Sequence, residues 1–250
     1  LQSNRYVNIE VDRVSQNFVL SNNEFNRVQD FAKQLEKEQE AVAYYSKALQ
    51  NQQVPYSIVK EHYEIVLNTL KEIDENQLSL VNTLTDLSQQ EKSIRDGLDV
   101  FELDLRNMKR TIEKYHLPGL PKEYLELFFA TSSRIEQLSQ LMNRVKLDMT
   151  EITGLNQTIE DDVEKLDIMT EEIVDNAQLT EYMIQQANRY RLEHPEIDTA
   201  IQQALEQFNH FYRYGESLAI IEKALNQVDP GSAQRVRDSY QSEKNNSLFF

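Results

Sequence analysis

The sequence predicts an all-α protein, an elongated rod of consecutive antiparallel three-helix bundles that share long continuous helices. Two observations lead to this prediction. The 250 residues include only 5 glycines and 5 prolines, so the chain has few places to turn. Apolar side chains recur three and four residues apart over long stretches, which is the spacing of one helix face. Long helices with short connections follow from the two observations together.

The first complete helix is predicted to start just after Ser21. Ser21 and Glu24 have the spacing of a capping box, in which a hydroxyl and a carboxylate satisfy free backbone amides at a helix start. This helix should run to about residue 52, and Pro55 can serve as the first residue of the next one. Residues 6–16 look like the end of an earlier helix.

The next helix should continue without a break from Pro55 to the turn before Pro118. A helix of about sixty residues would be roughly 90 Å long, too long for one small bundle, so two bundles must share it. The seam would also fit a parallel dimeric coiled coil, although the proline turns favour a chain that folds back on itself. Its apolar positions alternate three and four apart, with only Glu91 breaking the row, at Leu80, Leu84, Leu87, Ile94, Leu98, Phe101, Leu105, Met108, Ile112 and Tyr115.

The strongest turn signal is the Leu-Pro-Gly-Leu-Pro segment at 117–121, where the chain should reverse. A helix from Pro121 should reach a second turn near residues 148–151, and another long helix should then stop at His194-Pro195. Two shorter helices should form a hairpin about Gly215, with Phe208 and Phe211 among its facing apolar residues.

This order of helices has the layout of spectrin repeats. The predicted domains are a spectrin-like repeat at 1–88, whose first part completes an upstream repeat, and a second spectrin-like repeat at 89–176. A C-terminal helical bundle follows at 177–240, and a frayed tail occupies 241–250.

Composition narrows the function classes. The formal charge is −16 and the isoelectric point is near 4.7, which disfavours binding to nucleic acid or anionic lipid. The absence of cysteine excludes disulfides and thiolate sites, and it fits a reducing compartment. No apolar run reaches about eighteen residues and no signal peptide opens the chain, so a soluble fragment is expected. Because the chain starts at Leu1, it is expected to be a piece of a longer protein.

Residues that could support chemistry are sparse. Glu113 and His116 have the spacing of a di-iron carboxylate helix, but such a site needs a second pair from another helix, and only one is found. The acidic runs 160–162 and 171–172 lack the glycine turn of a calcium loop and are expected to be solvated. Phosphate-binding glycine loops and nucleophile elbows are absent from the sequence. No enzyme activity, metal or cofactor is therefore predicted.

One polar helix face is a candidate binding site. Glu181, Gln185, Asn188 and Arg189 should gather opposite the apolar side of their helix. The spacing of Gln185, Asn188 and Arg189 makes a contiguous patch of amide and guanidinium groups suited to hydrogen-bonding a partner. On periodicity alone, an ordinary solvated face explains these residues as well.

Several segments, in this order, resemble the EzrA family of bacterial septation ring formation regulators. They lie at residues 117–121, 124–128, 176–181, 185–191, 224–225 and 229–231, and the similarity is specific from about residue 110 to 240. The resemblance implies a single N-terminal transmembrane helix and a cytoplasmic arch of spectrin-like repeats that binds the tubulin-like division protein FtsZ. It also implies that a Gln-Asn-Arg patch, here Gln185, Asn188 and Arg189, serves recruitment to mid-cell.

The predicted function is a non-enzymatic regulator of bacterial cell division that binds FtsZ and limits or positions septal ring assembly through protein contacts. Other division or cell-wall synthesis proteins are expected partners, and no nucleic acid or small-molecule substrate is expected. The resemblance places the full-length protein on the cytoplasmic side of the membrane at the division septum, held by an anchor that this chain lacks. The alternative is a passive spectrin-like or coiled-coil spacer, and self-association stays open.

Overall fold

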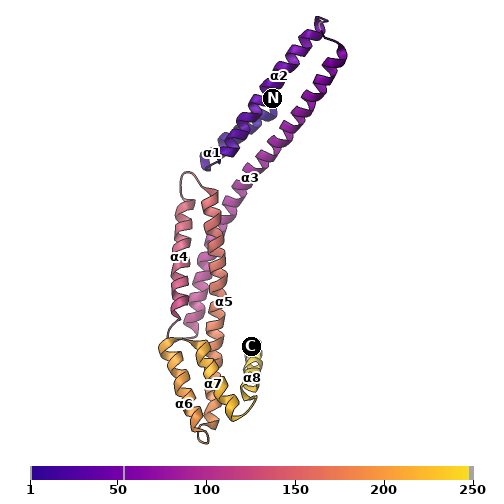
Figure 1. The fold of residues 1–250 in the computed structure, drawn as a ribbon. Helices are drawn as coiled ribbons and strands as arrows, with labels where there is room; N and C mark the ends of the chain where they lie inside the picture. The colour runs from indigo at the N-terminus through magenta and orange to yellow at the C-terminus, as the bar shows by residue number, and fades with distance from the viewer. Residues whose placement is uncertain (1, 53, 248–250) are drawn as a thin grey trace. The chain divides into compact units, whose positions relative to one another are not determined.

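The computed structural model describes residues 2–52 and 54–247 of the chain and confirms the all-α prediction. Within those residues no strand forms (Figure 1). The α-helices are α1 (Gln2–Asn17), α2 (Asn22–Gln50), α3 (Tyr56–Lys114), α4 (Lys122–Met142), α5 (Met149–Ala187), α6 (Pro195–Glu206), α7 (Tyr214–Val228) and α8 (Ser232–Ser247). Two short elements complete the order, the 3-10 helix η1 (Asn188–Tyr190) and the π-helix η2 (Gln207–Phe211).

Local signals in the sequence set several helix ends where they were predicted. Ser21 is the N-cap of α2, and its backbone N–H donates a hydrogen bond of 2.7 Å to the Glu24 carboxylate. At the start of α5, the Asp148 carboxylate accepts hydrogen bonds from the backbone N–H groups of Thr150 and Glu151, at 3.1 Å and 3.3 Å. The helix α3 is continuous over 59 residues, and every residue of its predicted apolar seam is buried or half-buried.

The chain divides into two compact units, and both α3 and α5 contribute to each of them. Unit 1 consists of Leu1–Leu98 with Leu138–Asn156, and unit 2 of Asp99–Gln137 with Gln157–Phe250. The domain boundaries predicted at residues 88 and 176 fall inside α3 and α5 and stay a prediction.

Unit 1 joins α1, α2 and the first part of α3 to the loop between α4 and α5. The Val19 N–H donates to the Leu147 carbonyl and the Leu147 N–H to the Asn17 carbonyl, both at 2.9 Å. Arg95 on α3 donates to the Met142 carbonyl at the end of α4, at 3.1 Å. These bonds tie the loop to the α1–α2 turn and to α3.

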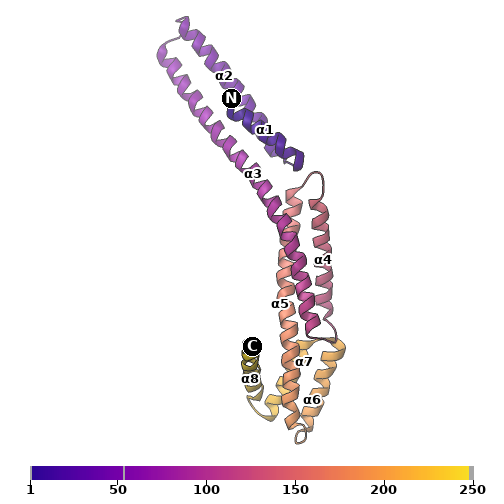
Figure 2. The ribbon, with the colours of Figure 1, turned by 180° about the vertical axis from the view of Figure 1, so that it is seen from behind.

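In unit 2, the last part of α3 lies beside α4 and α5 in both views (Figures 1 and 2). The buried Tyr124 hydroxyl of α4 is 2.9 Å from the Thr170 hydroxyl of α5, and Arg134 pairs with Asp162 between the same helices. Beyond them, α6, α7 and α8 enclose the end of α5 around a separate apolar cluster.

The predicted turn at 117–121 connects α3 to α4 and also contacts the start of α7. The Tyr214 hydroxyl donates a hydrogen bond of 2.6 Å to the Gly119 carbonyl, and the Tyr212 ring lies directly against Gly119. Burial raises the pKa of Tyr214 to about 12, so the phenol stays protonated and able to donate above the ordinary phenol pKa of 10.

The turn between α6 and α7 lies at a different residue from the one predicted. The α6–α7 hairpin reverses at Tyr212, which adopts a left-handed φ of 57°, whereas Gly215 lies inside α7. As a result Phe211 is 52% exposed and does not face α7. At the C-terminus, α8 includes residues 241–247, part of the tail for which fraying was expected; the tail's last three residues lie outside the described part of the chain.

Candidate protein-binding face

The end of α5 is held from one side by the apolar cluster of unit 2. Met183 and Ala187 are fully buried, and so are Ile197 on α6 and Ile221 on α7, which belong to the same cluster. Met183 and Ala187 are one turn apart on α5, so their burial fixes which side of this helix faces inward. The opposite side is left to solvent.

The structure places Glu181, Gln185, Asn188 and Arg189 on that opposite side, where all are exposed. Among the described residues, no hydrogen bond or ion pair engages the side chains of Gln185, Asn188 or Arg189. We refer to these four residues as the polar patch. Its two amides and one guanidinium are free to meet a partner, with Glu181 about one turn before Gln185.

The patch is wider than the sequence predicted, because α5 stops at Ala187 and not at His194. Asn188 and Arg189 lie in η1, where three residues make one turn. Successive side chains there diverge by about 120°, compared with about 100° in an α-helix. Asn188 and Arg189 therefore spread to either side of Gln185.

Contacts from the following elements explain this tightening. The Tyr190 hydroxyl donates to the Asp229 carboxylate at 3.2 Å, and the His194 N–H donates to the Tyr190 carbonyl at 2.9 Å. Arg235 also pairs with Asp229, at 2.6 Å, and this contact lowers the pKa of that carboxyl. Asp229 thus fixes Tyr190 to the α7–α8 turn.

The two arginines of this segment have different surroundings. Arg191 is paired with Asp198 on α6, at 2.5 Å. Arg189, only two residues earlier, has no such partner among the described residues and stays on the exposed side. An ion pair with Arg189 therefore remains open to another molecule, whereas one with Arg191 would have to compete with Asp198.

The C-terminal helix α8 lies beside the patch, which the sequence did not indicate. On α5, the Tyr182 hydroxyl donates to Glu243 at 2.8 Å and Gln178 accepts from the Tyr240 hydroxyl at 3.1 Å. The hydrogen bond from Tyr182 to Glu243 raises the pKa of the Tyr182 phenol.

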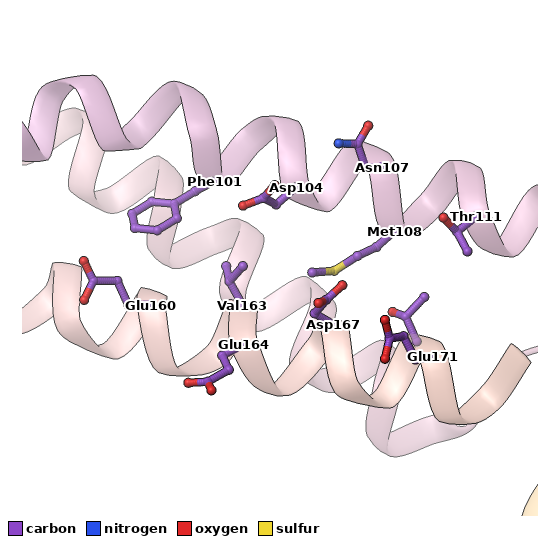
Figure 3. A pocket seen from close by; sticks show the side chains of 11 residues that line it. Phe101, Asp104, Asn107, Met108, Thr111, Glu160, Val163, Glu164, Asp167 and Glu171 are labelled. Atoms are coloured by element: carbon purple, nitrogen blue, oxygen red, sulfur yellow. The ribbon is translucent and has the colours of Figure 1, made fainter. Parts of the chain in front are cut away.

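A second surface feature in unit 2 is an open groove of about 520 Å³ between α3 and α5 (Figure 3). Phe101, Met108 and Val163 form its apolar part. The carboxylates around it are Asp104, Glu160, Glu164, Asp167 and Glu171.

This groove contains members of both acidic runs considered in the sequence. Glu160 and Glu171 are eleven positions apart on one helix, about 16 Å along its axis, which is too far to share one cation. Of the described His, Asp and Glu residues, no three are grouped closely enough to hold a metal ion. His116 lies in the turn after α3 with a left-handed φ of 49°, outside the helical spacing with Glu113 that a di-iron site would need.

None of the helices described here has the length and apolar content needed to cross a membrane.

Comparison with known proteins gives one family. The family model for the septation ring formation regulator EzrA matches residues 1–240. The chain is 37% identical to the septation ring formation regulator EzrA of Enterococcus faecalis over 246 aligned residues. This alignment covers 98% of this chain and 43% of that protein. The chain is 32% identical over 248 residues to that of Streptococcus sanguinis, covering 99% and 43%. The match to that of Lactococcus lactis subsp. lactis is 34% over 242 residues, covering 97% and 42%.

The chain spans less than half the length of these curated relatives. No solved structure is significantly similar to it. The family match extends upstream of residue 110, beyond the region over which the sequence resemblance is specific. From the extent of the family match and from these relatives, the chain belongs to the EzrA family of septation ring formation regulators.

Proposed function

We propose that this chain regulates assembly of the bacterial division ring by binding FtsZ through the polar patch of Glu181, Gln185, Asn188 and Arg189. It acts through protein contacts and not through catalysis. The observation that carries the proposal is the exposure of three hydrogen-bonding side chains, Gln185, Asn188 and Arg189, without partners of their own on a helix end that is otherwise held rigidly.

Rigid support of the patch favours specific binding. Met183 and Ala187 beneath it are fully buried, so α5 cannot rotate without disturbing the apolar cluster. Side chains presented from a fixed helix lose less conformational freedom on binding than side chains from a mobile loop. Arg189 can also bind a carboxylate with two parallel hydrogen bonds, which fixes orientation as well as position.

Co-sedimentation with FtsZ polymers tests the proposal. The intact chain is compared with the triple variant Gln185→Ala, Asn188→Ala, Arg189→Ala, after circular dichroism shows equal helicity. We expect the variant to bind at least about tenfold more weakly, which corresponds to about 1.4 kcal/mol.

A matched control uses an exposed face of similar chemistry on α2, the triple variant Asn26→Ala, Gln29→Ala, Lys33→Ala. This control should pellet like the intact chain. If both variants bind equally, the patch is not the FtsZ surface. If the intact chain itself does not pellet, the chain is better described as a passive spacer.

We further propose that the long helices α3 and α5, with α4 between them, build spectrin-like repeats. In the full-length protein these repeats would lie on the cytoplasmic side of the membrane at the division septum, behind a single N-terminal anchor. Other division and cell-wall synthesis proteins, or a second copy of the chain, would contact the remaining helix faces.

A further inference from the structure

The polar patch continues along α5 into a surface that is already occupied. Asp175, Gln178, Tyr182, Gln185 and Arg189 follow one another at intervals of three and four residues, so they form one stripe along the helix. The first three bond to α8, whereas neither of the last two makes a hydrogen bond or ion pair with it among the described residues. The chain therefore covers half of the stripe with its own C-terminal helix.

The two halves of α8 are held in different ways. Its first half is anchored on α7, because Ala233 is buried, the Ser232 hydroxyl donates to the Leu225 carbonyl at 3.0 Å, and Arg237 pairs with Glu222. Buried contacts of this kind resist local opening.

In the second half of α8, residues 240–247, the described side chains that meet α5 do so mainly through polar contacts. Lys244 pairs with Asp175 at 2.6 Å, yet their side chains are 37% and 56% exposed. Ion pairs this exposed contribute little to stability. Among the side chains described there, the half-buried ring of Tyr240, whose centroid is 5.5 Å from that of Tyr182, is the main apolar contact. Few buried apolar contacts and exposed polar ones mark a segment that opens locally.

We infer that the α5 stripe from Asp175 to Arg189 is one helix-docking surface and that residues 240–247 are a detachable strap over its first half. This inference rests on the proposed function of the polar patch and deepens it. The partner is a helix that lies along α5, as α8 does, and it competes with the strap for Tyr182.

The chemistry of the stripe describes that helix. Arg189 and the Gln185 amide need acceptors, so the partner helix carries carboxylates opposite them. Tyr182 accepts an aromatic neighbour and donates to a carboxylate, as it now does with Tyr240 and Glu243. A helix that carries carboxylates opposite Gln185 and Arg189, an aromatic residue opposite Tyr182 and a cation opposite Asp175 fits both halves of the stripe.

The substitution Lys244→Glu releases the strap without shortening the chain, because it places a carboxylate against Asp175. Lys223→Glu is the matched control, since it makes the same charge change at an exposed position of α7. Amide hydrogen exchange followed by mass spectrometry measures the release. We expect amides 240–247 to exchange about tenfold faster in Lys244→Glu than in the control, because a short detached helix frays in water. Equal exchange rates in the two variants would refute the inference that residues 240–247 form a detachable strap.

Binding to FtsZ polymers then tests the competition. If the strap is open about a tenth of the time, releasing it should tighten the apparent affinity about tenfold, with the control unchanged. Binding by Lys244→Glu that is no tighter than binding by Lys223→Glu would refute the shared surface. If none of the chains pellets, the FtsZ assignment fails, whereas the strap is still decided by the exchange rates.

Discussion

Replacing Gly119 by alanine should destabilise the protein, although alanine usually stabilises a chain relative to glycine. A Cβ atom at residue 119 would lie 2.4–2.7 Å from atoms of the Tyr212 ring. Ordinary carbon contacts are about 3.5–4.0 Å, so the ring or the 117–121 turn must move by about 1 Å. Overpacking of this kind costs about 1–3 kcal/mol, and the lower end applies if the half-buried Tyr212 ring can swing outward.

The control is the same substitution in the interior of α3. A Cβ at Gly97 meets nothing within 4 Å. Gly97→Ala should therefore stabilise by about 0.5–1 kcal/mol through backbone entropy alone. Urea unfolding followed by circular dichroism should move the two midpoints in opposite directions at constant slope.

A double-mutant cycle isolates the proposed contact. With Tyr212→Ala in the background, the cost of Gly119→Ala should disappear, giving a coupling energy of about 1 kcal/mol or more. An unchanged cost in that background would show that the ring is not what excludes a side chain at residue 119.

Three further outcomes are expected. Thr170→Val should cost about 1–3 kcal/mol in urea unfolding, because it leaves the buried Tyr124 hydroxyl without its partner, and adding Tyr124→Phe should recover part of that loss. Arg235 lowers the pKa of Asp229, so this pair stabilises the fold above the ordinary aspartate pKa of 3.8 and loses its effect as the pH falls below that value. In Arg235→Gln, the melting temperature should therefore fall less steeply with decreasing pH in the acid range than it does in the intact chain. Ile197→Ala should cost about 2–5 kcal/mol by calorimetry or urea unfolding, since Ile197 is fully buried in the cluster beneath the patch; no measurable loss would contradict its place there.

The helix pattern of this chain was predictable because its signals are local. Ser21 and Glu24 are three residues apart, and the side chain of each accepts a hydrogen bond from the backbone N–H of the other. No distant contact is therefore needed to place the start of α2. The prolines at 118 and 121 end one helix and open another by covalent geometry. The seam of α3 follows from periodicity that persists over many turns.

The end of α5 depends on contacts that sequence spacing does not reveal. Residues 188–193 carry no proline or glycine, and the helix still stops at Ala187. Tyr190 is held by Asp229, which lies 39 positions further along the chain. Such a pairing appears only once α6, α7 and α8 have folded around α5.

The exposure of the candidate site was predicted from the sequence, but the helix α8 that lies next to it was not. Glu181, Gln185, Asn188 and Arg189 are exposed as the periodicity indicated, while their role in binding stays a prediction. The contact of α8 with Tyr182 was not foreseen because the polar sequence after residue 240 suggested a frayed end. Polar side chains such as Glu243 can dock a helix only when their partners are already in place.

The π-helix η2 is a place where the chain can vary in both composition and length. A π-turn holds one more residue than the α-helical turn it replaces, and here it lies directly before Tyr212 and Tyr214, the two residues that contact Gly119. Asn209 and His210 are exposed within η2, so many amino acids should be tolerated at both positions. Deleting either one leaves the residue count of an ordinary α-helical turn, so we expect the turn to close in that form with Tyr214 still beside Gly119, and homologous segments should tolerate a difference of one residue here.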